Sequence, residues 1–377
     1  MKQSTAERPP SVTAKERPTK KFKKPSSEKL RAMGLECSIS LIAFALSIIT
    51  GGIILAILGV NPLTAYASLF KGALGTPSAI AGTINRMIPI ILAGLAIAVG
   101  RKGSVFNIGV EGQLIIGALL GCLAGIYLKL PAIIHLPVCL LCGMLGGMAW
   151  AFIPAWLRLK KNVGVVFTTI MFNYIAKFLL TYLVISVFVT SGGQLSATEK
   201  MQDTARLPAL IGRPYNINSG ILIAVLAVIV VYIFINKTKW GYEMRATGIN
   251  KNASGSAGIN VDRNMFLALL ISGALAGLGG CLEIHGSVFR MFADYSPGYG
   301  PTGIAVALLA KSNPIAVLLT AFLFGAMRNG AALMQMSTGV SSEFVSIVQG
   351  LIIIFVCSEN FIRYLMKKAQ KRGVAHA

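Results

Sequence analysis

Long stretches without charged residues limit the folds open to this 377-residue chain more than any other feature. The clearest are residues 37–60, 135–156 and 219–236. An apolar membrane core of about 30 Å needs roughly 20 helical residues, which these stretches approach or exceed. Of all residues, 55% are apolar and 13% are charged, and the mean hydropathy of +0.71 excludes an ordinary soluble domain. The sequence predicts an integral membrane protein with an all-α fold, a polytopic helix bundle.

Further apolar stretches contain glycines or an isolated polar group. They are residues 86–99, 108–128, 164–189, 264–286, 314–333 and 343–361. Residues 302–310 are too short to cross a membrane unless they extend through the preceding glycines or form a re-entrant segment covered by protein. Nine or ten spans are compatible with the sequence, and we predict ten.

The distribution of Lys and Arg predicts the orientation of these spans. With ten alternating spans and a cytoplasmic N-terminus, 26 of the 35 basic residues fall on the inner side and 7 on the outer side. This asymmetry follows the positive-inside rule, so both termini are expected to be cytoplasmic. Much of the net charge of +22 then lies beside anionic lipid, and nucleic-acid binding is not expected. Lys177 and Arg328 fall within spans, where each either faces Glu111 or Glu283 or reaches the interface.

The two ends of the chain differ from the apolar middle. Residues 1–36 contain KKFKK with scattered Pro and Ser and lack hydrophobic periodicity, which predicts a disordered basic cytoplasmic tail. Residues 37–363 form the predicted transmembrane domain, and residues 364–377 form a second basic tail. The first apolar run is too long for a secretory signal and is followed by further spans, so we expect a signal anchor.

An acid and an amide interrupt the apolar pattern in FNIGVEGQLIIGALLG. Glu111 and Gln113 follow Phe106 and Asn107 and lead directly into an apolar helix. An ionised acid at mid-membrane is unfavourable by about 2.5–3.5 kcal/mol on insertion scales, so such a residue usually faces a cavity or a partner. Two interpretations stay open: a site within the membrane, or an acid near a helix start that is solvated among the headgroups.

Two short segments resemble each other. GLAIAVGRKG begins at Gly94 and GIAVALLAKS begins at Gly303; each predicts a short helix, a basic inner turn and a re-entering helix. Duplicated halves are typical of transporters, with the substrate path at their interface. The repeat predicts two pseudo-repeated halves, although composition alone can produce two such apolar matches.

Nothing in the sequence predicts chemistry by this chain. The phosphate-binding string GxxxxGK[ST] does not occur, so ATP hydrolysis of that kind is not expected. The six cysteines and three histidines share no spacing that would hold a metal. We therefore expect neither an enzyme nor a bound cofactor.

The loop 241–263, GYEMRATGINKNASGSAGINVDR, contains a predicted short helix. Residues 250–257 have the composition of one or two helical turns, with Asn250 as N-cap and Gly258 as the C-terminal stop. On the predicted cytoplasmic face, such a helix either docks into another protein or is a solvated connector. The residues of the loop alone favour the connector, since caps and helix breakers mark any loop.

Several strings resemble one family. RATGINKNASGSAGINV resembles the coupling-helix segment of ABC importer permeases of the branched-chain amino acid and ribose type, and FNIGVEGQLIIGA resembles an element of the subgroup that imports nucleosides or related sugars. Similar stretches are NPLTAYASLFKGALG, IPIILAGLAIAV, TTIMFNYIA, GYGPTGIAVALLAKSNP and LFGAMRNG, so the resemblance covers nearly everything after the basic tail. Val165 stands where the family often has a glutamate, and Ser254 replaces an alanine of the coupling segment.

The resemblance implies a membrane permease subunit that forms the translocation path for nucleosides. ATP with Mg²⁺ would be bound and hydrolysed by a partner ABC ATPase. The other implied partners are a second permease, expected to be a paralogue, and an extracellular substrate-binding lipoprotein. The implied location is the cell membrane, with several passes.

The resemblance also implies roles for two groups of residues. The residues expected to line the path are Phe106, Asn107, Glu111, Gln113, Asn173 and Tyr174. The residues expected to couple to the ATPase are Arg245, Ala246, Gly248, Asn250, Ala253 and Gly258.

Other functions stay open at this point. Within the same family, the cargo can be a simple sugar such as ribose or galactose, because ribose is common to sugars and nucleosides. An ion-coupled secondary transporter would use Glu111, Glu283 or Asp294 as proton carriers, but the chain lacks a convincing set of paired acids at mid-membrane. A passive channel would need no docking loop.

Overall fold

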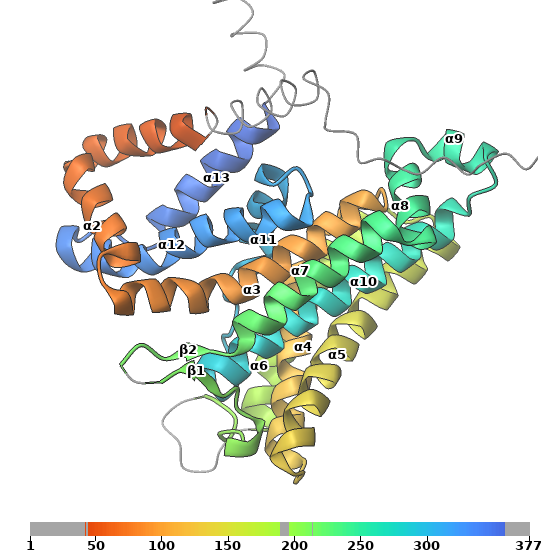
Figure 1. Cartoon of the computed structure of the whole chain (residues 1–377), viewed down its shortest axis with the longest axis horizontal. Helices are drawn as coiled ribbons and strands as arrows, with labels where there is room; N and C mark the ends of the chain where they lie inside the picture. Colours follow the sequence, from red (N-terminus) through yellow and green to blue (C-terminus); the bar gives the residue numbers. More distant parts are fainter. Residues whose placement is uncertain (1–41, 43, 189–195, 213, 359–377) are drawn as a thin grey trace, which may run out of the picture.

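The computed structural model describes residues 42, 44–188, 196–212 and 214–358, so both predicted tails lie outside the described residues. The described chain is a bundle of α-helices with one small antiparallel hairpin (Figure 1). After an apolar helix over Phe44–Ile57, the elements are α2 (Pro62–Leu74), α3 (Pro77–Lys102), α4 (Val110–Tyr127), α5 (Ala132–Lys161), α6 (Val165–Ser186), η1 (Asp203–Ala205), β1 (Ala209–Ile211), β2 (Ile217–Asn218), α7 (Gly220–Lys237), α8 (Lys239–Ile249), α9 (Lys251–Ser256), α10 (Val261–Glu283), the π-helix η2 (Ile284–Val288), α11 (Tyr299–Leu309), α12 (Pro314–Thr338) and α13 (Phe344–Cys357).

The predicted all-α polytopic fold is confirmed. Among the described residues, seven helices are long and apolar enough to cross a membrane, namely α3, α4, α5, α6, α7, α10 extended by η2, and α12. Three shorter apolar helices, Phe44–Ile57, α11 and α13, account for the remaining predicted spans. The total of ten stays a prediction, since these three are below the length that a straight span requires.

The first helices differ from the prediction. α2 is a separate helix, where the sequence pattern gave only a connection between two spans. α3 begins at Pro77, earlier than the predicted residue 86, because Thr76 caps it by accepting a hydrogen bond from the Ala79 N–H and Pro77 suits the first turn. The segment beginning at Gly94 is therefore the end of a 26-residue helix and not a short helix of its own.

Gly143 with Gly147 and Gly273 with Gly277 stand four residues apart, a spacing that predicts closely packed helices, and the helices that carry them, α5 and α10, do pack closely together and with α4. α3, α4 and α10 are mostly buried, whereas α5, α6 and α7 expose much of their apolar surface. A Cβ atom added at Gly277 of α10 would lie 3.0 Å from the Cα and the N of Gly147 on α5. Glycine at both positions therefore brings the two backbones together, which is the usual way helices associate in a membrane.

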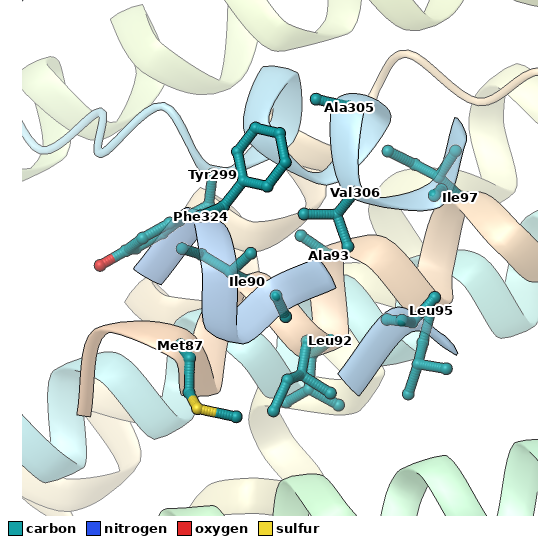
Figure 2. Packing of buried hydrophobic residues seen from close by; sticks show 14 of the residues in the cluster. Met87, Ile90, Leu92, Ala93, Leu95, Ile97, Tyr299, Ala305, Val306 and Phe324 are labelled. Carbon is teal, nitrogen blue, oxygen red and sulfur yellow. The ribbon is translucent and has the colours of Figure 1, made fainter. Parts of the chain in front are cut away.

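The two segments of the predicted repeat pack against each other. A Cβ at Gly94 of α3 would lie 2.7 Å from a methyl group of Val306, and a Cβ at Gly303 of α11 would lie 2.8 Å from Ala93. Figure 2 shows Ala93 and Val306 in this cluster, with Tyr299 and Phe324 beside them. Gly94 and Gly303 are the first residues of the two similar strings, and each of them lies against the helix that contains the other. The two-fold repeat itself stays a prediction.

The glycine contact between α5 and α10 gives a first test. We expect Gly277→Ala to lower thermal stability in detergent, since overpacking a well-packed core costs about 1–3 kcal/mol. Gly350→Ala is the matched control, because a Cβ there meets no atom within 4 Å. The measurement is the apparent melting temperature of both variants, taken from the folded fraction that size-exclusion chromatography detects after heating. Equal melting temperatures would contradict the close approach of the helices.

Candidate functional site

Asn107 joins the segment before α4 to α4 itself and to α10. Its Nδ2 donates to Oε1 of Gln113 and to Oγ of Ser272, each at 2.8 Å. Its Oδ1 accepts from the backbone N–H of Gly109 at 2.9 Å. Asn107 and Gln113 are fully buried, so the polar atoms of Asn107 are satisfied within the protein. In this state both residues organise the start of α4.

Asn173 of α6 caps the first turn of α4. Its Oδ1 accepts from the Gly112 N–H at 2.8 Å, and its Nδ2 donates to the Ile108 carbonyl at 2.9 Å. The N-cap residue of α4, Gly109, has no side chain that could do this. Since the first N–H groups of a helix lack partners within it, a side chain from a neighbouring helix satisfies one of them here.

Glu111 caps a different helix, α11. Its Oε1 accepts from the Gly298 N–H at 2.8 Å and from the Ser296 hydroxyl at 3.4 Å, and its Oε2 accepts from the Gly300 N–H at 2.6 Å. The carboxylate is buried against the free N–H groups and the positive end of the α11 dipole. A helix N-terminus is a ready anion site, and in this protein the anion is the protein's own glutamate.

Glycines make this contact possible. Gly298 has a φ of +70°, in the left-handed region that favours glycine. A Cβ at Gly300 would lie 2.8 Å from the Cβ of Glu111 and 2.9 Å from its backbone nitrogen. The first turn of α4 therefore lies directly against the first turn of α11.

A second group of ionisable side chains lies beside the first. The Tyr299 hydroxyl donates to Oε1 of Glu283 at 3.0 Å. The Arg328 guanidinium carbon lies 4.3 Å from the centroid of the Tyr299 ring, and this guanidinium donates to the Pro297 carbonyl. Arg328 therefore lies beside Tyr299 and Pro297, next to the groups that bond Glu283 and Glu111, as one interpretation of the sequence expected. Lys177 is exposed on α6 and does not belong to this group.

The structure brings together only some of the residues expected to line a path. Asn107, Glu111, Gln113 and Asn173 surround the N-terminus of α4, and Phe106 is half-buried just before it. Tyr174 is 58% exposed on α6 and points away from this group. That these residues contact substrate stays a prediction.

Sequence reasoning missed the partners of these residues. Ser272 and Ser296 gave no signal, because single hydroxyls occur in many spans. The run SPGYGPTG did carry a signal: Pro and two glycines before a short apolar segment indicate a helix start within the membrane. Nothing in the sequence indicated that Glu111, so distant along the chain, satisfies that start.

The loop predicted to couple to an ATPase contains the expected short helix. α9 has Asn250 as N-cap, with Oδ1 accepting from the Ala253 N–H at 3.1 Å, and Gly258 follows it at a φ of +79°. Ala253 is exposed, and Ile249, the last residue of α8, is 87% exposed. The surface of α9 is therefore open.

Three other predicted coupling residues, Arg245, Ala246 and Gly248, lie on α8 and contact the helix bundle more closely than Ala253 does. A Cβ at Gly248 would lie 3.1 Å from the carbonyl carbon of Lys102, at the end of α3. Arg245 and Ala246 are half-buried, and Nε of Arg245 is buried without a partner among the described residues. α8 therefore rests on α3, while α9 projects from it (Figure 1).

Comparison with known families agrees with this architecture. The sequence model of the family described as "Branched-chain amino acid transport system / permease component" matches residues 79–357. The chain belongs to this permease family. It is a transport subunit of the ABC type and not an enzyme, and the permease is a multi-pass membrane protein.

Relatives of the permease differ in the substrate that their names give. The guanosine ABC transporter permease protein NupP of Bacillus subtilis is 38% identical, over 89% of this chain and 97% of the relative. The glucose ABC transporter permease protein TsgB13 of Haloferax volcanii is 36% identical, over 83% and 85%. The nucleoside ABC transporter permease protein NupB of Lactococcus lactis is 34% identical, over 88% and 93%. No solved structure matches the permease.

Each of these three organisms also contains a more distant relative of the permease. These are the guanosine permease protein NupQ of Bacillus subtilis at 24% identity, the nucleoside permease protein NupC of Lactococcus lactis at 26% identity and the putative glucose permease protein TsgC13 of Haloferax volcanii at 26% identity. In each organism, two relatives that differ in their identity to this chain carry the same substrate in their names.

The cap on α11 gives a second test. We expect Glu111→Ala to lower the free energy of unfolding by about 1.5–3 kcal/mol, the range for hydrogen bonds to a charged group. Glu111→Gln should lose less, because its amide oxygen still accepts one bond. Glu199→Ala is the control, since Glu199 is exposed. The measurement is denaturant unfolding in detergent; a Glu111→Ala permease as stable as the control would refute the capping role.

Proposed function

We propose that this permease carries nucleosides through the membrane as part of an ABC importer, with ATP hydrolysed by partner subunits. The relatives NupP and NupB, which cover nearly the whole chain, support this substrate class by their names. The family description names branched-chain amino acids, so the choice between an amino acid and a neutral polar solute needs a physical argument.

The position of Glu111 supplies that argument. In transporters with broken helices, the positive ends of half-helices commonly point at anionic groups of the substrate, such as an amino acid carboxylate. Here the N–H groups of Gly298 and Gly300 at the start of α11 already bind the Glu111 carboxylate. This end of α11 offers no free N-terminus to a substrate anion. The arrangement favours an uncharged polar cargo, and it is the observation on which the proposal rests.

A simple sugar is the second candidate. TsgB13 is named a glucose permease and is almost as similar to this chain as NupP. A hexose or pentose is also uncharged, so the capped α11 does not separate a sugar from a nucleoside.

We propose that one face of loop 241–263 contacts a partner ATPase and that the other face contacts the rest of the permease. The open surface of α9, with Asn250 and Ala253, would dock into an ABC ATPase, while Gly248 and Arg245 of α8 would pass the movement to α3. α3 ends in Arg101 and Lys102 and α7 ends in Lys237, both next to α8 (Figure 1). These basic ends support a cytoplasmic position for the loop and, with alternating spans, for both termini.

The second permease subunit would be a paralogue rather than a copy of this chain. The paired relatives in Bacillus subtilis and Lactococcus lactis support this composition. An extracellular lipoprotein would deliver the substrate. Binding and hydrolysis of ATP would then shift the bundle between outward-open and inward-open states, which requires that nucleotide binds the two states with different affinity.

A competition assay tests the substrate class. We expect ATP-dependent uptake of labelled guanosine into liposomes that contain the permease and its partner subunits. Excess uridine or inosine should compete strongly, and leucine should not compete, because the cap on α11 leaves no site for its carboxylate. Stronger competition by glucose or ribose than by nucleosides would establish the sugar instead.

The permease reconstituted alone is the control for the energy source. It should not accumulate guanosine against a gradient, with or without a pH gradient across the membrane. Accumulation driven by the pH gradient would replace the ABC mechanism by ion coupling.

A further inference from the structure

The hydroxyl of Tyr295 lacks a partner although it is buried. Tyr295 lies in the connector, residues 289–298, which links η2 to α11. Its hydroxyl oxygen is inaccessible and has no hydrogen bond within the described part of the chain. Buried hydroxyls nearly always have a partner, so an orphaned one needs an explanation, such as a ligand that this state does not hold.

The groups around Tyr295 are polar. Tyr295 packs against the same cluster that contains Tyr299, whose hydroxyl donates to Oε1 of Glu283 and whose ring lies under the Arg328 guanidinium. Glu111 is occupied by α11, and Arg328 donates to Pro297. Glu283 is only half-buried. Within the described residues its Oε1 accepts a hydrogen bond from Tyr299, and its Oε2 accepts none. An acceptor at Oε2 of Glu283 and a hydroxyl at Tyr295 are therefore left for a ligand.

Tyr295 also packs against two hydrophobic clusters. One is built mainly on α3, α7, α11 and α12, and the other on α4, α6 and the segment around Met201 and Ala205. We expect a movement of one cluster relative to the other to uncover the hydroxyl.

The connector itself is held in an unusual conformation. It follows a π-helix, and Phe289 has a φ of +62°, which is rare for a bulky side chain. Arg206 lies 5.0 Å from the Phe289 ring centroid, and the N–H of Met201 donates to the Phe289 carbonyl. Strained backbone held in place by its surroundings is typical of binding and switch regions.

We propose that Oε2 of Glu283 and the hydroxyl of Tyr295 form a subsite that binds the ribose hydroxyls of the transported nucleoside. This inference rests on the proposed function. A carboxylate accepts hydrogen bonds from hydroxyl groups of ribose, and a phenol both donates and accepts. A site built for a hydroxyl discriminates against the analogue that lacks it, because its own polar groups are then left unpaired.

The test is competition for guanosine uptake by 2′-deoxyguanosine and 3′-deoxyguanosine in the complete transporter. In the unmodified protein, at least one deoxy analogue should compete about tenfold less well than guanosine, the equivalent of one hydrogen bond. Glu283→Gln should reduce guanosine uptake. It should also bring the ratio of the two competition strengths, that of guanosine over that of deoxyguanosine, close to one. Asp294→Asn is the matched control, since Asp294 is an exposed acid in the same connector, and its ratio should not change.

Tyr295→Phe keeps the test valid if Glu283→Gln fails to fold. It removes a hydroxyl that has no hydrogen bond in this state, so the protein should keep its stability. We expect this variant to lower the same ratio.

Each negative outcome has a distinct meaning. Absence of nucleoside uptake by the unmodified transporter would refute the proposed function. Nucleoside uptake with no discrimination in the unmodified protein, or with a ratio unchanged in both variants, would overturn the subsite alone. A folded Glu283→Gln permease that takes up all analogues more slowly by the same factor would show that Glu283 has only a structural role, and this also overturns the subsite.

Discussion

The bond between the Glu111 carboxylate and the first N–H groups of α11 is the interaction on which the centre of this permease depends. In a membrane, backbone groups must be satisfied inside the protein, so irregular segments are tolerated only where other parts cover them. Two such segments, residues 103–109 and the connector, meet here. Glu111 satisfies the start of α11, and Asn173 satisfies the start of α4. Without these side chains neither helix could begin within the bundle.

Polar residues within the spans therefore have a structural role before a functional one. Asn107, Gln113 and Ser272 bond to each other, and Glu111 and Asn173 bond to the backbone. Beside them, Glu283 and Tyr295 are incompletely hydrogen-bonded within the part of the chain that the structure describes. Since a fully bonded group has little left to offer a ligand, recognition is better sought where bonding is incomplete.

The sequence predicted what depends on local pattern. Hydropathy predicted the helices, the spacing of Gly143, Gly147, Gly273 and Gly277 predicted close packing, and Asn250 with Gly258 predicted α9. It did not predict the separate helix α2 or the early start of α3, since capping by Thr76 is a weak local signal. The site was only half predictable: Glu111 stood out by its charge, but its partners lie more than 180 residues away along the chain.

The contact between Gly248 and the end of α3 has a mechanical consequence. At Gly248 no side chain separates the backbone of α8 from the carbonyl group of Lys102 at the end of α3. If a partner pushed on α9, the displacement would therefore reach α3 through a direct backbone contact. The segment after α3 contains Asn107 and leads to the start of α4, so the same displacement would reach the helix starts at the centre of the bundle.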